Sequence, residues 1–129
     1  MDKVVHFEIP FDDAKRAKEF YSKVFGWKIE DVPQMNYHMV HTVEIDENRM
    51  PKQAGAINGG LYKRDDKSAK SPVIVIDVAK IDDYVKKIKK AGGKVVREKS
   101  TVGDMGFYAQ VSDTEGNVIG IWETIQSKK

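Results

Sequence analysis

Two side chains near the start of the chain have types and a spacing that could do chemistry. His6 and Glu8 are two positions apart, so on an extended strand both point to the same face. An imidazole and a carboxylate on one face could hold a divalent metal or move a proton. A lone histidine on a strand is more often structural, and that interpretation stays open. The chain contains no cysteine, which excludes disulfides, thiolate nucleophiles and cysteine-ligated metals.

Further candidates for contact with a ligand lie on segments that read as strands. His41 falls on an apolar face with Tyr37 and Met39, where it either lines a cavity or is buried against the backbone. Aromatic residues in such strands form either core or pocket walls. The candidate ligand-binding residues are Glu8, His41, Tyr62, Lys63, Tyr108 and Trp122.

Several classes of function find no support in the sequence. Residues 55–60 are glycine-rich but lack the lysine and helix start of a phosphate-binding loop, and no nucleophile sits in a recognisable elbow. The 22 basic and 20 acidic residues are interspersed and give a net charge of +2, so no basic field for nucleic acid is expected. No apolar run approaches about 18 residues, so we expect no membrane partner and a cytoplasmic location.

The elements that would position these residues occur twice. Strands are expected at 3–9, 27–30, 37–45 and 55–63, and again at 72–78, 94–97, 105–111 and 118–124. Each first strand is followed by a helical stretch, at roughly 13–25 and 80–91, that ends at glycine. A shift of 67 positions lays Ala14 on Ile81 and Tyr21 on Ile88, so the helix faces match. The same shift lays His6 on Val73.

The repeated order predicts an α+β fold of two tandem βαβββ modules. We expect one curved, mostly antiparallel sheet, with the helices on one face and a cup on the other. Each module of roughly 65 residues would be marginally stable alone. We therefore predict a single domain over residues 1–129, with module 1 at about 1–64 and module 2 at about 72–126.

Four segments make the chain resemble the vicinal oxygen chelate superfamily, which includes glyoxalase I, bleomycin resistance proteins and extradiol dioxygenases. They are His6-Phe-Glu-Ile-Pro10, Ala17-Lys-Glu-Phe-Tyr21, Phe25-Gly-Trp27 and Asp113-Thr-Glu-Gly-Asn-Val-Ile-Gly-Ile-Trp-Glu123. The resemblance covers nearly the whole chain and implies the glyoxalase-like fold. It does not fix an activity, because this fold hosts several chemistries.

The resemblance also implies where a metal would bind. Metal-using members take their ligands from the first and last strands of each module, which here gives His6, Lys63, Val73 and Glu123. Only His6 and Glu123 are ordinary metal ligands, so the resemblance implies an incomplete site, in which Glu123 is also the candidate catalytic residue. No cofactor is expected, beyond a weakly bound divalent metal such as nickel, zinc or manganese.

Two functions follow from the resemblance, and the sequence does not decide whether the protein is an enzyme. The first is a small-molecule-binding protein without a complete metal site, in which Lys63 is a counter-ion for an acidic ligand. The alternative is a metal-dependent, glyoxalase-type lyase or isomerase that uses His6 and Glu123. In both cases a homodimer is expected, because the family commonly pairs modules edge to edge.

Overall fold

The computed structural model describes residues 1–33, 36–66 and 69–125. Both copies of the predicted unit are present, and the helices lie within one residue of their expected limits. The elements are β1 (Val4–Phe11), α1 (Ala14–Phe25), β2 (Lys28–Val32), β3 (Tyr37–His41), β4 (Asn58–Lys63), β5 (Val73–Asp77), α2 (Ile81–Lys90), β6 (Lys94–Val102), β7 (Gly106–Ser112) and β8 (Val118–Thr124).

The chain divides into two compact units, and each is described by itself. The N-terminal unit covers residues 6–72, and the C-terminal unit covers residues 1–5 and 73–129. The strand order is β2-β3-β4-β1 in the first and β5-β8-β7-β6 in the second. In each unit the first and last strands pair in parallel and the other pairings are antiparallel. The predicted mostly antiparallel, glyoxalase-like fold is therefore confirmed.

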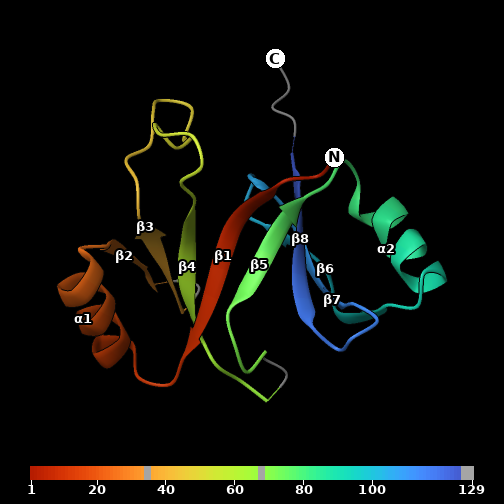
Figure 1. Cartoon of the computed structure of the whole chain (residues 1–129), viewed down its shortest axis with the longest axis horizontal. Helices are drawn as coiled ribbons and strands as arrows, with labels where there is room; N and C mark the ends of the chain where they lie inside the picture. The colour runs from red at the N-terminus through yellow and green to blue at the C-terminus, as the bar shows by residue number, and fades with distance from the viewer. Residues whose placement is uncertain (34–35, 67–68, 126–129) are drawn as a thin grey trace. The chain divides into compact units, whose positions relative to one another are not determined.

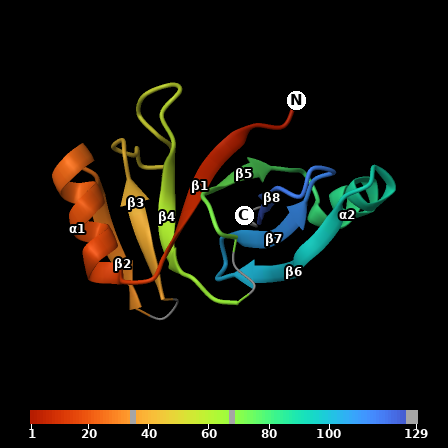
Figure 2. The ribbon, with the colours of Figure 1, turned by 60° about the horizontal axis from the view of Figure 1, so that its bottom comes forward.

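Each helix covers one face of the strands in its own unit (Figures 1 and 2). Below α1 lies a core of Phe11, Val40 and Leu61, which are at most 7% exposed. Below α2, Ile81 packs with Ala109, Val111 and Ile121. We call the opposite side of each set of strands the open face. Strand alternation puts every second residue there.

The end of each helix follows the pattern read from the sequence, but its start differs between the units. Asp13 caps α1, since its Oδ1 accepts a hydrogen bond of 2.9 Å from the Arg16 amide. Gly26 ends that helix in the left-handed conformation, at φ 71°. The N-cap of α2 is Lys80, whose side chain makes no cap hydrogen bond. Another residue must therefore satisfy the first amides of α2.

Some strand limits and one helix position were predicted wrongly. β1 does not end at Pro10 but continues to Phe11, paired with β4. β3 stops at His41 instead of 45, because the Asn58 side chain takes over the amides of Thr42 and Val43. β6 runs on to Val102. Val24, placed on the apolar stripe of α1, is 57% exposed. No helix in the part of the chain that the structure describes is long and apolar enough to span a membrane.

Candidate functional site

The open face of the N-terminal unit gathers most of the sequence-predicted residues. In β1, the core residues Phe7, Ile9 and Phe11 face α1, so the intervening His6 and Glu8 face the other way. In β3 and β4 the same alternation applies around Val40 and Leu61. The open face of this unit therefore carries His6, Glu8, Tyr37, Met39, His41, Gly60 and Tyr62.

A hydrogen bond between His6 and Tyr37 is the centre of this face. His6 Nε2 and the Tyr37 hydroxyl are 2.8 Å apart. Tyr37 can lie there because β4 offers Gly60: a Cβ at that position would overlap the Tyr37 phenol. Gly59 likewise leaves room for Phe7 on the helix-covered face. The pair Gly59-Gly60 thus admits two aromatic rings on opposite faces of β4.

Burial keeps the His6 imidazole neutral. Desolvation lowers the pKa of His6 from its ordinary value of 6.5 to about 4. At neutral pH the ring is uncharged, and which ring nitrogen carries the proton depends on the tautomer. A metal ion approaching Nε2 would have to displace the Tyr37 hydroxyl.

Glu8 brings a carboxylate into the same face. Glu8 is only 9% exposed. Among the residues that the structure describes, Glu8 and Gln110 are the buried polar ones. In the parallel pairing of β1 and β4 it lies in register with Gly60, beside the position that Tyr37 covers. Tyr37 and Tyr62 face each other in the β3–β4 register. An imidazole, a carboxylate and two phenols therefore occupy neighbouring positions of one unit.

His41 lies on the same face, farther along β3. Its Nε2 is 3.8 Å from Glu30 Oε1 on β2, a distance at which the interaction is weak. The histidine is half-buried and lies at an edge of the site, and its predicted role as a ligand-contacting residue stays a prediction.

The C-terminal unit repeats this aromatic arrangement but not the chemistry. Tyr108 lies over Gly120, where a Cβ would come within 2.7 Å of the phenol oxygen, and it pairs in register with Trp122. Gln110 Nε2 donates to the Tyr108 hydroxyl at 2.9 Å. Under the 67-residue shift, however, Val73 and Val75 stand where the other unit has His6 and Glu8. His6 and Glu8 therefore have no titratable counterpart at the corresponding positions of the C-terminal unit.

Glu123 does not point to an open face, contrary to the sequence-based prediction. Its neighbour Ile121 packs in the core beneath α2, and Glu123 shares that side of β8. Its Oε1 accepts a hydrogen bond of 2.8 Å from the amide of Ile81, the first residue of α2. Because Lys80 cannot cap this helix, Glu123 supplies the missing acceptor from the last strand.

Lys63 occupies the position of the N-terminal unit that corresponds to Glu123, and it also contacts the start of a helix. It lies on the helix-covered side with Leu61, and its Nζ donates to the backbone carbonyl of Asp12, one residue before the α1 cap. In each unit the two aligned metal positions thus fall on opposite faces, His6 against Lys63 and Val73 against Glu123. Within each unit, the two positions that the resemblance implied as metal ligands are therefore not brought together. Within the described residues, no three histidines or carboxylates cluster as metal ligands.

Sequence reasoning missed some of the residues that shape these faces. It did not single out Gln110 as a partner of Tyr108, nor the contact between His6 and Tyr37. The signal that could have found that contact is the β3–β4 register, which pairs Tyr37 with Tyr62 and so puts it on the same face as Gly60, two positions away along β4. It also passed over Lys18, Asp31 and His38, which meet on the helix-covered side of the N-terminal unit.

Comparison with known proteins agrees with the resemblance read from the sequence. Residues 3–42 match the family model described as bleomycin resistance protein-like N-terminal. The protein CFP32 of Mycobacterium bovis, whose name assigns it provisionally to the glyoxylases, is 28% identical over 119 residues. That match covers 86% of this chain and 41% of the relative, so the chain spans about two fifths of the curated relative's length.

Solved structures show the fold. A glyoxalase/bleomycin resistance protein/dioxygenase superfamily member from Vibrio splendidus has a TM-score of 0.62 at 12% identity, covering 95% of this chain and 99% of its own. Methylmalonyl-CoA epimerase from Mycobacterium tuberculosis has a TM-score of 0.61 at 16% identity, covering 95% and 87%. The chain therefore has the fold of this superfamily, and its N-terminal segment carries the bleomycin-resistance-like sequence pattern.

Proposed function

We propose that the chain is a small-molecule-binding protein of the glyoxalase/bleomycin resistance superfamily that works without a complete metal site. The observation that carries this proposal is the His6–Tyr37 pair, held over Gly60 beside the buried Glu8. Binding sites combine apolar and aromatic walls with a few fixed polar groups. Here Tyr37, Tyr62 and Met39 provide the walls, and His6 and Glu8 provide the polar groups.

The charges of this face favour a particular kind of ligand. Glu8 is an acceptor when ionised, and His6 is neutral. A ligand with an aromatic or apolar body and a cationic or N–H group would pair with the carboxylate and stack on the phenols. Lys63 lies on the helix-covered face, so it does not act as the counter-ion for a ligand on the open face. Tyr108 and Trp122 remain proposed wall residues on the C-terminal open face.

The alternative is a metal-dependent, glyoxalase-type lyase or isomerase that uses His6 and Glu123. In its favour are the glyoxylase name of the mycobacterial relative and the presence of His6 at an aligned ligand position. Against it are the contacts of the aligned residues: Glu123 holds the Ile81 amide and Lys63 holds the Asp12 carbonyl. We therefore favour binding over metal-assisted catalysis.

Calorimetric titration with metal-free bleomycin, in the presence of EDTA, tests the proposal. The matched family model motivates this probe, which has aromatic and cationic groups. We expect one site per chain whose affinity does not change when nickel replaces EDTA. Tyr37→Ala should weaken binding by about tenfold, the usual effect of truncating an aromatic anchor. Tyr37→Phe keeps the ring, so it should retain most of the affinity.

Elemental analysis separates the two functions. Protein dialysed against nickel, zinc or manganese should hold far less than one equivalent of metal, and His6→Ala should not change that amount. One equivalent of metal lost in His6→Ala, together with glyoxalase activity of the loaded protein, would establish the alternative. Absence of bleomycin binding in EDTA would contradict the proposal.

Assembly and location are part of this proposal. We propose a homodimer, as expected from the resemblance, and a cytoplasmic protein. The exposed side chains of Phe20, Val24 and Phe25 in the last two turns of α1 support an interface there. Under the 67-residue shift, the C-terminal unit has Lys87, Ala91 and Gly92 at these positions.

A further inference from the structure

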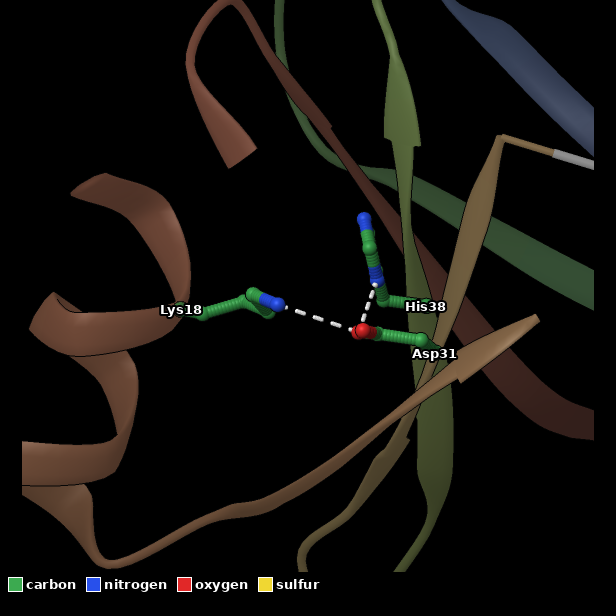
Figure 3. A network of polar contacts seen from close by, with 3 residues as sticks. All are labelled: Lys18, Asp31 and His38. Carbon is green, nitrogen blue, oxygen red and sulfur yellow. Dashed lines mark hydrogen bonds and ion pairs between the residues drawn. The ribbon is translucent and has the colours of Figure 1, made fainter. Parts of the chain in front are cut away.

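A polar network joins α1 to β2 and β3 on the helix-covered side of the N-terminal unit. Asp31 Oδ1 lies 2.8 Å from His38 Nδ1 and 3.0 Å from Lys18 Nζ. Figure 3 shows the carboxylate between the two, with the second ring nitrogen of His38 pointing away from Asp31. The Lys18 and His38 contacts lower the pKa of Asp31, so it is ionised and accepts from both partners.

The duplicated unit shows that the fold does not need polar groups at this place. His38 pairs in register with Leu61, and Ala109 pairs with the corresponding Ile121 in the C-terminal unit. The 67-residue shift lays Lys18 on Val85. Ala109 and Val85 both belong to the apolar cluster beneath α2. Polar groups thus replace core residues in one copy only, and half-buried polar groups cost stability unless they are paired.

A cavity of about 410 Å³ adjoins this network. Its volume lies in the range of small-molecule sites. The lining is apolar at several positions and charged at others: Phe11, Asp12, Ala14, Asp31, Val32, Pro33, Asn36, Tyr37, His38 and Lys63. The side chain of His38 is 14% exposed, and its ring lies tilted by 48° beside the Phe11 ring, at 5.4 Å between centroids. The histidine therefore has a fixed position in the wall.

The charges around the cavity leave Lys63 as the group suited to an anion. Asp31 is paired with Lys18, and Asp12 is paired with Arg64 at 2.7 Å. Asp13 is engaged in capping α1, and its pKa is lowered first by the hydrogen bond from the Arg16 amide and to a lesser extent by Lys63. The Lys63 ammonium contacts a neutral carbonyl, that of Asp12, and an ammonium has three donors.

His38 complements that cation. Since the ionised Asp31 accepts from Nδ1–H, the neutral ring presents its lone pair at Nε2, and the protonated ring presents a second donor there. Nε2 can therefore form a hydrogen bond with an oxygen of an acidic ligand. Phe11, Val32 and Pro33 would contact the apolar part of such a molecule.

We propose that this cavity is a second binding site, which takes a small organic anion, a carboxylate or a phosphate monoester with an apolar body, between His38 and Lys63. The site lies on the side of the N-terminal unit opposite the face that carries His6 and Glu8, and the proposal does not depend on the function proposed above.

Nuclear magnetic resonance of protein labelled at the histidine rings tests this site directly. The probes are benzoate and phenyl phosphate, with benzyl alcohol as the neutral control, titrated to about 20 mM at low ionic strength. We expect the His38 ring resonances to shift and saturate with at least one of the two anions, which also tells a carboxylate site from a phosphate site. The His41 ring serves as an internal reference, because it lies on the other face of the same strand. No saturation at His38 with either anion would overturn the proposal, as would equal shifts of both rings.

Matched variants locate the cation. Lys63→Met should weaken anion binding by about tenfold or more, as for loss of a hydrogen bond to a charged group. Lys52→Met removes an exposed lysine paired with Glu44 and should change nothing. If the Lys63 and Lys52 variants lose affinity equally, the anion binds by general charge and the proposal fails. The open-face variant Glu8→Gln changes the carboxylate proposed to pair with a cationic ligand and lies outside the cavity lining, so it should keep anion binding; failure of this site is therefore distinguishable from failure of bleomycin binding.

Discussion

Replacement of Glu123 should destabilise α2 and leave metal binding unchanged. The carboxylate accepts the amide of Ile81, while the N-cap residue Lys80 offers no acceptor. Glu123→Ala removes the hydrogen bond and also the negative charge at the positive end of the helix. Loss of a cap costs about 1 kcal/mol, and loss of the charge–dipole interaction costs about 0.5 kcal/mol more. We therefore expect a loss of about 1.5 kcal/mol in the free energy of unfolding.

Two further variants separate the hydrogen bond from the charge. Glu123→Gln keeps an oxygen acceptor and loses only the charge, so the loss should be about 0.5 kcal/mol. Lys80→Asp gives α2 a cap of its own, as Asp13 gives α1, and should restore most of the stability to Glu123→Ala. In a double-mutant cycle the two changes should be non-additive, because both act on the same amides.

Urea denaturation followed by far-ultraviolet circular dichroism measures these differences, with nickel binding measured on the same samples. The reasoning would be refuted if Glu123→Ala unfolded at the wild-type urea concentration. It would also be refuted if that variant lost a nickel site present in the wild type, since the carboxylate would then serve a metal. A rescue by Lys80→Asp that restored stability without altering nickel binding would support the structural role alone.

Three other predictions concern the open face and the assembly. The depressed pKa of His6 means that the unfolded chain binds a proton between pH 6.5 and about 4 that the folded chain does not. The free energy of unfolding should therefore decrease as the pH is lowered from 6.5 to about 4, by on the order of 2 to 3 kcal/mol in total. His6→Gln should remove this part of the dependence in urea titrations at several pH values. Gly60→Ala should destabilise by about 1 to 3 kcal/mol, because the new methyl overlaps Tyr37. Thermal unfolding should show a smaller effect for Gly120→Ala, and equal effects would contradict this account. Sedimentation at micromolar concentration should give a dimer, and Phe20→Lys, which copies the residue of α2, should shift it towards the monomer of 14.6 kDa. A wild type that sediments only as monomer would exclude the dimer.

The sequence predicted the fold because the helical spacing and the strand alternation of apolar residues occur in both units. Helical spacing and terminal glycines located both helices, since an amphipathic stripe and a left-handed cap depend on neighbouring residues alone. The strand ends were less accessible. β3 ends where the side chain of Asn58 captures the amides of Thr42 and Val43, an event that needs a residue 15 or 16 positions away. No local pattern carries that information.

The candidate site was predicted in part, for a related reason. His6 and Glu8 do share an open face, because strand alternation relates positions two apart within one strand. Glu123 was misplaced, because the resemblance implied its role without showing which of the two faces of β8 the helix α2 covers. The signal in the sequence is Lys80, whose side chain has no acceptor and so cannot cap α2.

The difference between the two units explains why Glu123 has a structural role at a position where the resemblance implied a metal ligand. In both units the last residues of the final strand reach the start of the helix, Lys63 through a backbone carbonyl and Glu123 through an amide. The sign of each side chain fits its partner, because a carbonyl requires a donor and an amide requires an acceptor. Because Asp13 already caps α1, the residue at position 63 can be cationic. Because the Lys80 side chain does not cap α2, the residue at position 123 supplies an oxygen acceptor. The carboxylate at position 123 is thus explained by helix capping, and on the open face of the N-terminal unit the chemistry available to a ligand is concentrated at His6, Tyr37 and Glu8.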